Sequence, residues 1–100
     1  MSAHSIQYYF EKAQPVFSAI PGMTELRHAE GSAYEQLSGQ YPDAAFALMT
    51  ANNLFQHDRE FSEIYQQAFF SIVDGQDIPS VRYRYEKNMD AYFQRHAWDD

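Results

Sequence analysis

The histidines are the residues of this chain best suited to bind a metal ion or to transfer protons. A helical zinc site needs two histidines four residues apart, and a di-iron bundle needs Glu-x-x-His motifs; the sequence has neither. A cluster made only by the tertiary fold remains open, and we predict no metal site. We expect His57 in a turn and His96 at a helix end, where the helix dipole favours a cation. The full set is His4, His28, His57 and His96.

Carboxylates, glycines and serines give no stronger sign of catalysis. Glu60 and Glu63 could perform acid–base chemistry, but a solvated helix face explains their spacing equally well. The four glycines lie too far apart to form a phosphate-binding loop, and no serine stands in a nucleophile-elbow motif. Cysteine is absent, which excludes thiolate nucleophiles, disulfides and cysteine-based zinc sites. We therefore predict no catalytic residues, no cofactor and no enzymatic activity.

The charge distribution points to a class of partner. The net charge of −7 is carried by residues 1–78, whereas residues 79–100 hold equal numbers of acidic and basic side chains. Because nucleic-acid affinity depends on cations that neutralise phosphates, direct binding of DNA or RNA is disfavoured. The same charge favours association with a basic protein surface.

The elements that must position these residues are predicted to be helices. Apolar residues recur three and four residues apart almost from end to end, and the alternation typical of strands is missing. This pattern predicts an all-α single domain over residues 1–100, with four to five helices joined by short turns. The third helix, from Pro42 to about Phe55, is apolar nearly all round. We therefore expect it to be central and most buried, with Phe46 and Leu48 in the core.

The first two predicted helices contain possible breaks. The first covers about Ser5–Ile20, and Pro15 would kink or split it. Thr24 is expected to cap the second, which would end before Gly39. A restart at Ser32 would divide the second helix, so the continuity of both stays open.

The last two predicted helices have clearer ends. Asp58 is expected to cap the fourth helix, and Asp74-Gly75 to close it. The fifth begins near Pro79 or Ser80 and runs towards His96. Residues 98–100 are expected to fray.

The segment from Leu48 to Ile72 resembles one unit of a tetratricopeptide-type helical hairpin. Residues 54–58 (LFQHD) would form the turn, and residues 65–69 (YQQAF) resemble the Y-x-x-A-[LF] run of the second helix in such a unit. The resemblance covers about a quarter of the chain. Stacked repeats need about three copies, and the sequence holds one. The resemblance therefore implies an antiparallel hairpin.

A surplus of aromatic residues supplies candidate binding residues. Some rings fall opposite the predicted buried stripes, where they either pack on another helix or lie singly on the surface. The functional interpretation is an aromatic anchor within an acidic rim, a composition suited to a protein interface. Phe70 is the strongest anchor because it lies mid-helix among polar residues. The predicted partner-binding residues are Phe70, Glu63, Gln66, Asp74, Glu60, Tyr83 and Tyr8.

Two classes of function fit these features. The first is a non-catalytic module that docks on a larger, basic protein and inhibits or chaperones it. Anti-defence proteins such as anti-CRISPR proteins, immunity proteins and secretion chaperones share this size and charge at the level of composition. Nucleic-acid mimicry is a sub-case that would need acids spaced like phosphates. The second class is a small-molecule-binding or catalytic helical bundle with a Tyr/His-lined pocket.

We favour the first class on the sequence. A solid core with an exposed apolar patch would support it, whereas a buried cavity with converging polar groups would support the second. A homo-oligomer remains open. The sequence has no basic stretch followed by an apolar run at its start and no apolar window of ~18–20 residues. We therefore expect a cytoplasmic protein without membrane contact.

Overall fold

The computed structural model describes residues 6–97 and folds them into six α-helices without a strand. The prediction of an all-α fold is confirmed, but the predicted number of helices is too low because the second predicted helix is divided. His4, Ser5 and residues 98–100 lie outside the described residues, as does the fraying predicted for the last three. The helices are α1 (Ile6–Ser18), α2 (Met23–Arg27), α3 (Gly31–Gln40), α4 (Pro42–Asn52), α5 (Arg59–Val73) and α6 (Ile78–Arg95).

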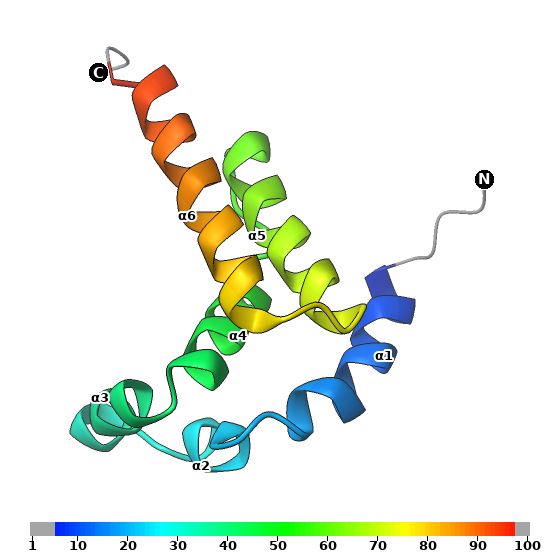
Figure 1. Ribbon diagram of the computed structural model, residues 1–100, viewed down its shortest axis with the longest axis vertical. Helices are drawn as coiled ribbons and strands as arrows, with labels where there is room; N and C mark the ends of the chain where they lie inside the picture. The colour runs from blue at the N-terminus through cyan, green and yellow to red at the C-terminus, as the bar shows by residue number, and fades with distance from the viewer. Residues whose placement is uncertain (1–5, 98–100) are drawn as a thin grey trace.

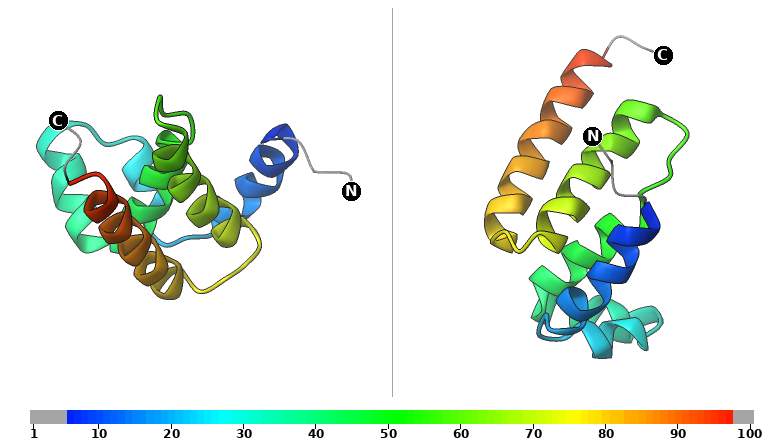
Figure 2. Two further views of the ribbon diagram at one scale, coloured as in Figure 1. Left: turned by 90° about the horizontal axis from the view of Figure 1, so that it is seen from above. Right: turned by 90° about the vertical axis from the view of Figure 1, so that its right-hand side faces the viewer.

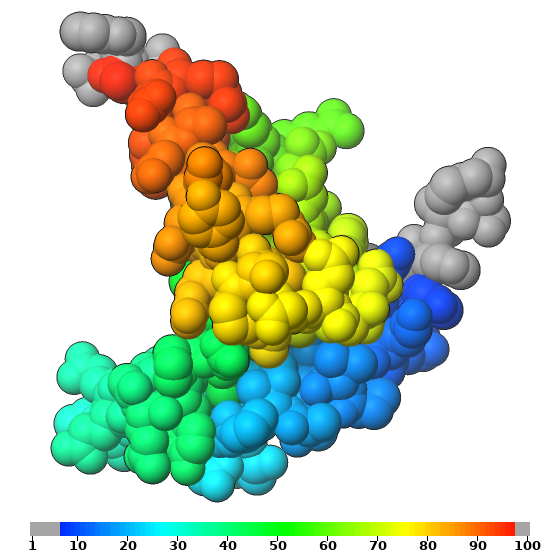
Figure 3. All heavy atoms as spheres, in the orientation of Figure 1, coloured from blue at the N-terminus to red at the C-terminus, as the bar shows by residue number. Residues whose placement is uncertain are grey.

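The described helices form two parts that differ in shape (Figure 1). Helices α1 to α4 make a layer, here called the base, and α5 and α6 rise from it as an antiparallel hairpin, here called the arm (Figures 1 and 2). Helix α4 packs against both arm helices, and α1 packs against α5. In the space-filling view the arm narrows above the base (Figure 3). The free end of the arm contains the start of α5 and the end of α6.

The first half of the chain departs from the predicted boundaries. Helix α1 continues through Pro15 as one helix. Helix α2 follows Gly22, so Thr24 lies inside it and the predicted cap is wrong. Met23 is 0% exposed, and its burial favours a helix start two residues earlier than a cap at Thr24 would give. A break does precede α3, at residues 28–30.

The predicted end of this region before Gly39 is also wrong. Gly39 lies within α3, which continues to Gln40. The Tyr41 N–H donates to the Leu37 carbonyl at 2.8 Å, so helical hydrogen bonding extends to the residue before Pro42. Pro42 then opens α4 in its first turn, as predicted.

Helix α4 lies centrally among the described helices, but, contrary to the sequence prediction, it is not the most buried of them. It contacts α2, α3, α5 and α6 and ends at Asn52, three residues before the predicted Phe55. Phe46 is buried, whereas Leu48 is only half-buried. Helix α5 holds the larger number of buried residues, because α1, α4 and α6 cover three of its sides.

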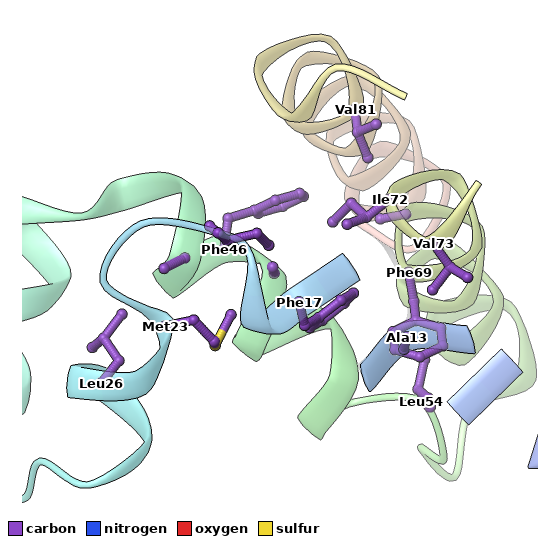
Figure 4. Close-up of a cluster of buried hydrophobic side chains, with 14 residues drawn as sticks. Ala13, Phe17, Met23, Leu26, Phe46, Leu54, Phe69, Ile72, Val73 and Val81 are labelled. Carbon is purple, nitrogen blue, oxygen red and sulfur yellow. The ribbon is translucent and has the colours of Figure 1, made fainter. Parts of the chain in front are cut away.

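The core has a large part and a small part. The large cluster joins the base to the lower arm, where the ring of Phe69 lies 5.4 Å from that of Phe17 (Figure 4). Val81 brings α6 into the same cluster. The small cluster lies higher in the arm, between α5 and α6, and its buried members are Ile64, Tyr65 and Met89.

Both arm helices begin at aspartate caps. The Asp58 carboxylate accepts from the Phe61 N–H at 3.0 Å, which confirms the predicted cap of α5. Asp77 accepts from the Ser80 N–H at 3.0 Å, so α6 begins at Ile78, slightly before its predicted start. At the other end of α5, Gly75 adopts φ 89°, and its N–H donates to the Ile72 carbonyl, as a helix stop requires.

One glycine of the base is fixed by a close approach. Gly22 has φ 86°, and a Cβ at this position would lie 2.1 Å from Cγ of Tyr41. The ring of Tyr41, between α3 and α4, therefore rests directly on the backbone before α2. The contact depends on the absence of a side chain at residue 22.

Candidate functional site

Polar side chains close the free end of the arm. The Tyr92 hydroxyl donates to Oδ2 of Asp58 at 2.7 Å. Glu60 forms an ion pair with Arg95 and also lies 3.1 Å from Nε2 of His96. These interactions join the first turn of α5 to the last turn of α6. They hold the two helix ends in one arrangement.

Aromatic rings pack beside this polar network. The ring of Phe61 lies 5.3 Å from that of Tyr92 and 6.4 Å from that of Phe93. The Tyr92 ring lies 4.4 Å from the His96 ring. Phe93 is 58% exposed, whereas Phe61 is half-buried. We call the whole group the tip cluster: Asp58, Glu60, Phe61, Tyr92, Phe93, Arg95 and His96.

Asp58, in the tip cluster, has a lowered pKa. The hydrogen bond from Tyr92 is the largest cause, followed by the bond from the Phe61 N–H, and both lower the pKa of Asp58. The charge of His96 acts in the same direction, while desolvation opposes it. Asp58 therefore serves as an ionised cap and as an acceptor from α6 at neutral pH.

A second feature lies beside the tip cluster, where the connection from α4 runs along α5. The Leu54 carbonyl accepts from the Ser62 hydroxyl and, at 2.8 Å, from Nε2 of Gln66. These bonds attach the connection to α5 and leave an open hollow of about 380 Å³ between them. We call it the loop hollow, and it is lined by Phe55, Gln56, His57, Arg59, Ser62, Glu63 and Gln66.

The structure brings together some of the polar residues predicted to bind a partner. Glu60 belongs to the tip cluster, and both Glu63 and Gln66 line the loop hollow. All three lie in the first half of α5. Asp74 follows the last residue of α5, at the opposite end of the arm, so it is separated from them.

The predicted aromatic anchor, Phe70, lies where α5 meets α1. The Phe70 ring is half-buried and lies 4.4 Å from the Tyr9 ring of α1, which is the packing on another helix that the sequence left open. Helix α1 covers this side of α5, and the sequence pattern of α5 alone cannot reveal that neighbour. Tyr8 is also half-buried, with its ring 5.4 Å from that of Tyr9. Tyr83 is 59% exposed on α6.

Sequence reasoning missed the two exposed phenylalanines near the free end. Phe93 follows the half-buried Tyr92 and therefore lies ~100° away from it around α6, a position that helical periodicity marks as peripheral. Phe55 was assigned to the third predicted helix. Because α4 ends at Asn52, Phe55 instead lies in the connection and is 72% exposed.

The tyrosines and histidines form no large shared pocket among the described residues. The Tyr85 and Tyr65 hydroxyls lie 3.4 Å apart between α5 and α6, and burial raises the pKa of Tyr85. The hollow that Tyr85 lines measures about 90 Å³. His57 lies in the turn before α5 and His96 directly after α6, as predicted. Across residues 6–97, no group of three potential ligands could hold a metal ion.

Comparisons of the chain with family models, curated proteins and solved structures gave no match. The hairpin implied by the tetratricopeptide resemblance involves α4 and α5, which are in contact, but the closely packed antiparallel pair is α5 and α6. Within the described part of the chain, no helix is both long enough and apolar enough to cross a membrane.

Proposed function

We propose that this protein is a non-catalytic binding module that docks on a larger protein with a basic surface. The tip cluster would make the contact, with Phe93 as its apolar anchor. The observation that carries the proposal is an exposed phenylalanine, 58% accessible, supported by the rings of Phe61 and Tyr92 at the free end of the arm.

The arrangement has the features of an interface anchor. Interface hot spots are rich in aromatic residues and are surrounded by polar groups that exclude water. The polar interactions of Asp58 and Glu60 with α6 restrain the neighbouring rings before binding. Such restraint reduces the conformational entropy that association would otherwise lose.

The charges around the anchor favour a basic partner. Asp58, Glu60 and Glu63 lie near the start of α5, with Arg59 and Arg95 beside them. The chain as a whole carries a net charge of −7. An electrostatic field of this sign accelerates association with a positively charged surface and does so less at high salt.

The alternative, a small-molecule or catalytic bundle, has less geometric support. The hollow that Tyr85 lines between α5 and α6 measures about 90 Å³. Pockets that enclose drug-sized ligands measure about 300–1,000 Å³. The larger hollows of the described surface are open, which suits contact with another macromolecule better than enclosure of a small ligand.

A matched pair of residues on α6 tests the proposal. Phe93 and Tyr83 are 58% and 59% exposed, and ten residues separate them by ~80° around the helix and ~15 Å along it. We expect Phe93→Ala to abolish recovery of the specific partner from the native host, while Tyr83→Ala retains it. A photo-cross-linking residue at position 93 should label the same partner. Equal recovery with both variants, at unchanged melting temperature, would contradict the proposed contact.

A further inference from the structure

We propose that the loop hollow binds the guanidinium group of an arginine side chain presented by the basic partner. This inference rests on the proposed function and names the chemical group that the second part of the contact would recognise. The hollow lies beside the tip cluster, since Arg59 and Glu63 of its lining belong to the same helical turns of α5 as Glu60.

The orientation of the Gln56 amide follows from a chain of hydrogen bonds. The Met49 carbonyl can only accept, so it fixes Nδ2 of Asn53 as the donor at 2.7 Å. Oδ1 of Asn53 must then accept, and Nε2 of Gln56 donates to it at 2.7 Å. The amide group of Gln56 thus directs its NH₂ to the protein. Its Oε1 has no donor among the described residues.

The Gln66 amide is oriented in the same way. Its Nε2 donates to the Leu54 carbonyl at 2.8 Å and also lies 3.1 Å from Oγ of Ser62. Because the Leu54 carbonyl can only accept, the nitrogen must face the connection. Oε1 of Gln66 therefore stays available as well. Both amides that line the hollow offer an acceptor; Gln66 uses both of its N–H donors within the protein, and Gln56 uses one.

The remaining walls suit a planar cation. The Glu63 carboxylate supplies a negative charge, and Phe55 supplies an aromatic ring in a residue that is 72% exposed. Arginine carries five N–H donors in one plane and can stack on an aromatic ring while it pairs with a carboxylate. The volume of about 380 Å³ accommodates a side chain of this size.

Two basic residues of the lining oppose a cation, and one of them provides a test. Arg59 lies 3.4 Å from Glu63, but the two side chains are 93% and 56% exposed. Ion pairs this exposed contribute little to stability, so an incoming guanidinium can replace Arg59 at the carboxylate. His57 lines the same hollow and is exposed. Arg59 therefore acts as an internal competitor.

The first experiment uses two probes of nearly identical shape. N-acetyl-arginine amide is cationic, whereas N-acetyl-citrulline amide is its neutral counterpart. Titration of the ¹⁵N-labelled protein should give saturable shifts of the Gln56 and Gln66 side-chain amide signals with the arginine probe, and at least tenfold weaker binding with citrulline. Equal responses to the two probes, or no shift of these signals, would overturn the proposal.

The second experiment compares three exposed-residue variants with the same arginine probe. Glu63→Gln should weaken binding at least fivefold, and Arg59→Gln should strengthen it about two- to fivefold because the competitor is gone. Glu25→Gln removes an exposed carboxylate from α2, far from the hollow in sequence, and should leave binding unchanged. Equal weakening by Glu63→Gln and Glu25→Gln would show a general charge effect and overturn the assignment. The spectra of the free variants verify that each remains folded.

The two proposals can fail separately. Loss of partner recovery with Phe93→Ala but not with Glu63→Gln would leave the proposed function intact and reject the arginine site. Saturable arginine binding that depends on Glu63, in a protein whose partner recovery ignores Phe93, would support the site and reject the tip cluster as the anchor.

Discussion

The base and the free end of the arm consist of the same kind of element but are held by different interactions. In the base, Met23, Ala44 and Ala47 are fully excluded from solvent, and a tyrosine ring rests on a glycine. At the free end, the buried cluster has only three residues, and exposed or half-exposed polar groups join α5 to α6. Stability therefore resides mainly in the base. Substitutions on the surface of the free end should therefore change the free energy of unfolding less than substitutions in the base.

The largest effect should come from the core that joins the base to the arm. Phe69 is 1% exposed and packs its ring against that of Phe17. We expect Phe69→Ala to lower the free energy of unfolding by about 3–5 kcal/mol, because it removes a buried ring and leaves a cavity. Met89→Ala, in the small cluster of the arm, should cost about 2 kcal/mol. Denaturant unfolding measures both, and a larger loss at Met89 would reverse the comparison.

The next largest effect on stability should come from the close approach of the Tyr41 ring to Gly22 in the base. Gly22→Ala should destabilise the protein by about 2–3 kcal/mol, since it combines a positive φ with a collision against Tyr41. Gly75 has a similar φ, but a Cβ there would meet nothing within 4 Å. Gly75→Ala should therefore cost only about 1 kcal/mol of backbone strain. Similar melting temperatures for the two variants would show that the Tyr41 contact is unimportant.

A smaller effect should appear at acid pH and only at the free end. The lowered pKa of Asp58 means that its contribution to stability is present above the pKa of the unfolded state and is lost as pH falls through the folded value. Tyr92→Phe removes the largest cause of this shift, so the pKa of Asp58 should rise towards its ordinary value. Melting curves between about pH 2 and 6 should then depend less on pH, whereas Tyr83→Phe should leave the profile unchanged. An unaltered profile in Tyr92→Phe would exclude this coupling.

The smallest effect on stability is expected at the proposed anchor. Phe93→Ala should change the free energy of unfolding by no more than about 0.5 kcal/mol, as is usual for exposed positions. Thermal melts beside Tyr83→Ala provide the comparison. A loss comparable to that of Met89→Ala would place Phe93 in the packing of the arm and separate it from binding.

The parts of the fold that local signals determine could be predicted. Asp58 caps α5 and Pro42 opens α4 because each acts on its own backbone within a few residues. Thr24 failed as a cap because burial of Met23 decides where α2 begins. The sequence contains both signals, but only the tertiary structure determines which one dominates.

The candidate site could be predicted only in part, for the same reason. Glu60 and Glu63 were identified because their helical spacing places them on one solvated side of α5. The contact between Phe70 and Tyr9 could not be predicted, because the two residues are 61 positions apart in sequence and periodicity carries no information about such contacts. The orientation of the Gln56 and Gln66 amides likewise requires the path of the connection after α4.

The bond between Asp58 and Tyr92 also has a kinetic consequence. It joins residues 34 positions apart, whereas Arg84 and Gln76, next to the turn of the arm, are separated by eight. Closing a longer loop costs more chain entropy, so the arm should form from its turn towards its free end, in the manner of a zipper. Opening of the arm should therefore begin at its free end, which forms last. Amide hydrogens at the start of α5 and the end of α6 should therefore exchange with solvent sooner than those near the turn, and the surface proposed to meet a partner is also the first part of the arm to open.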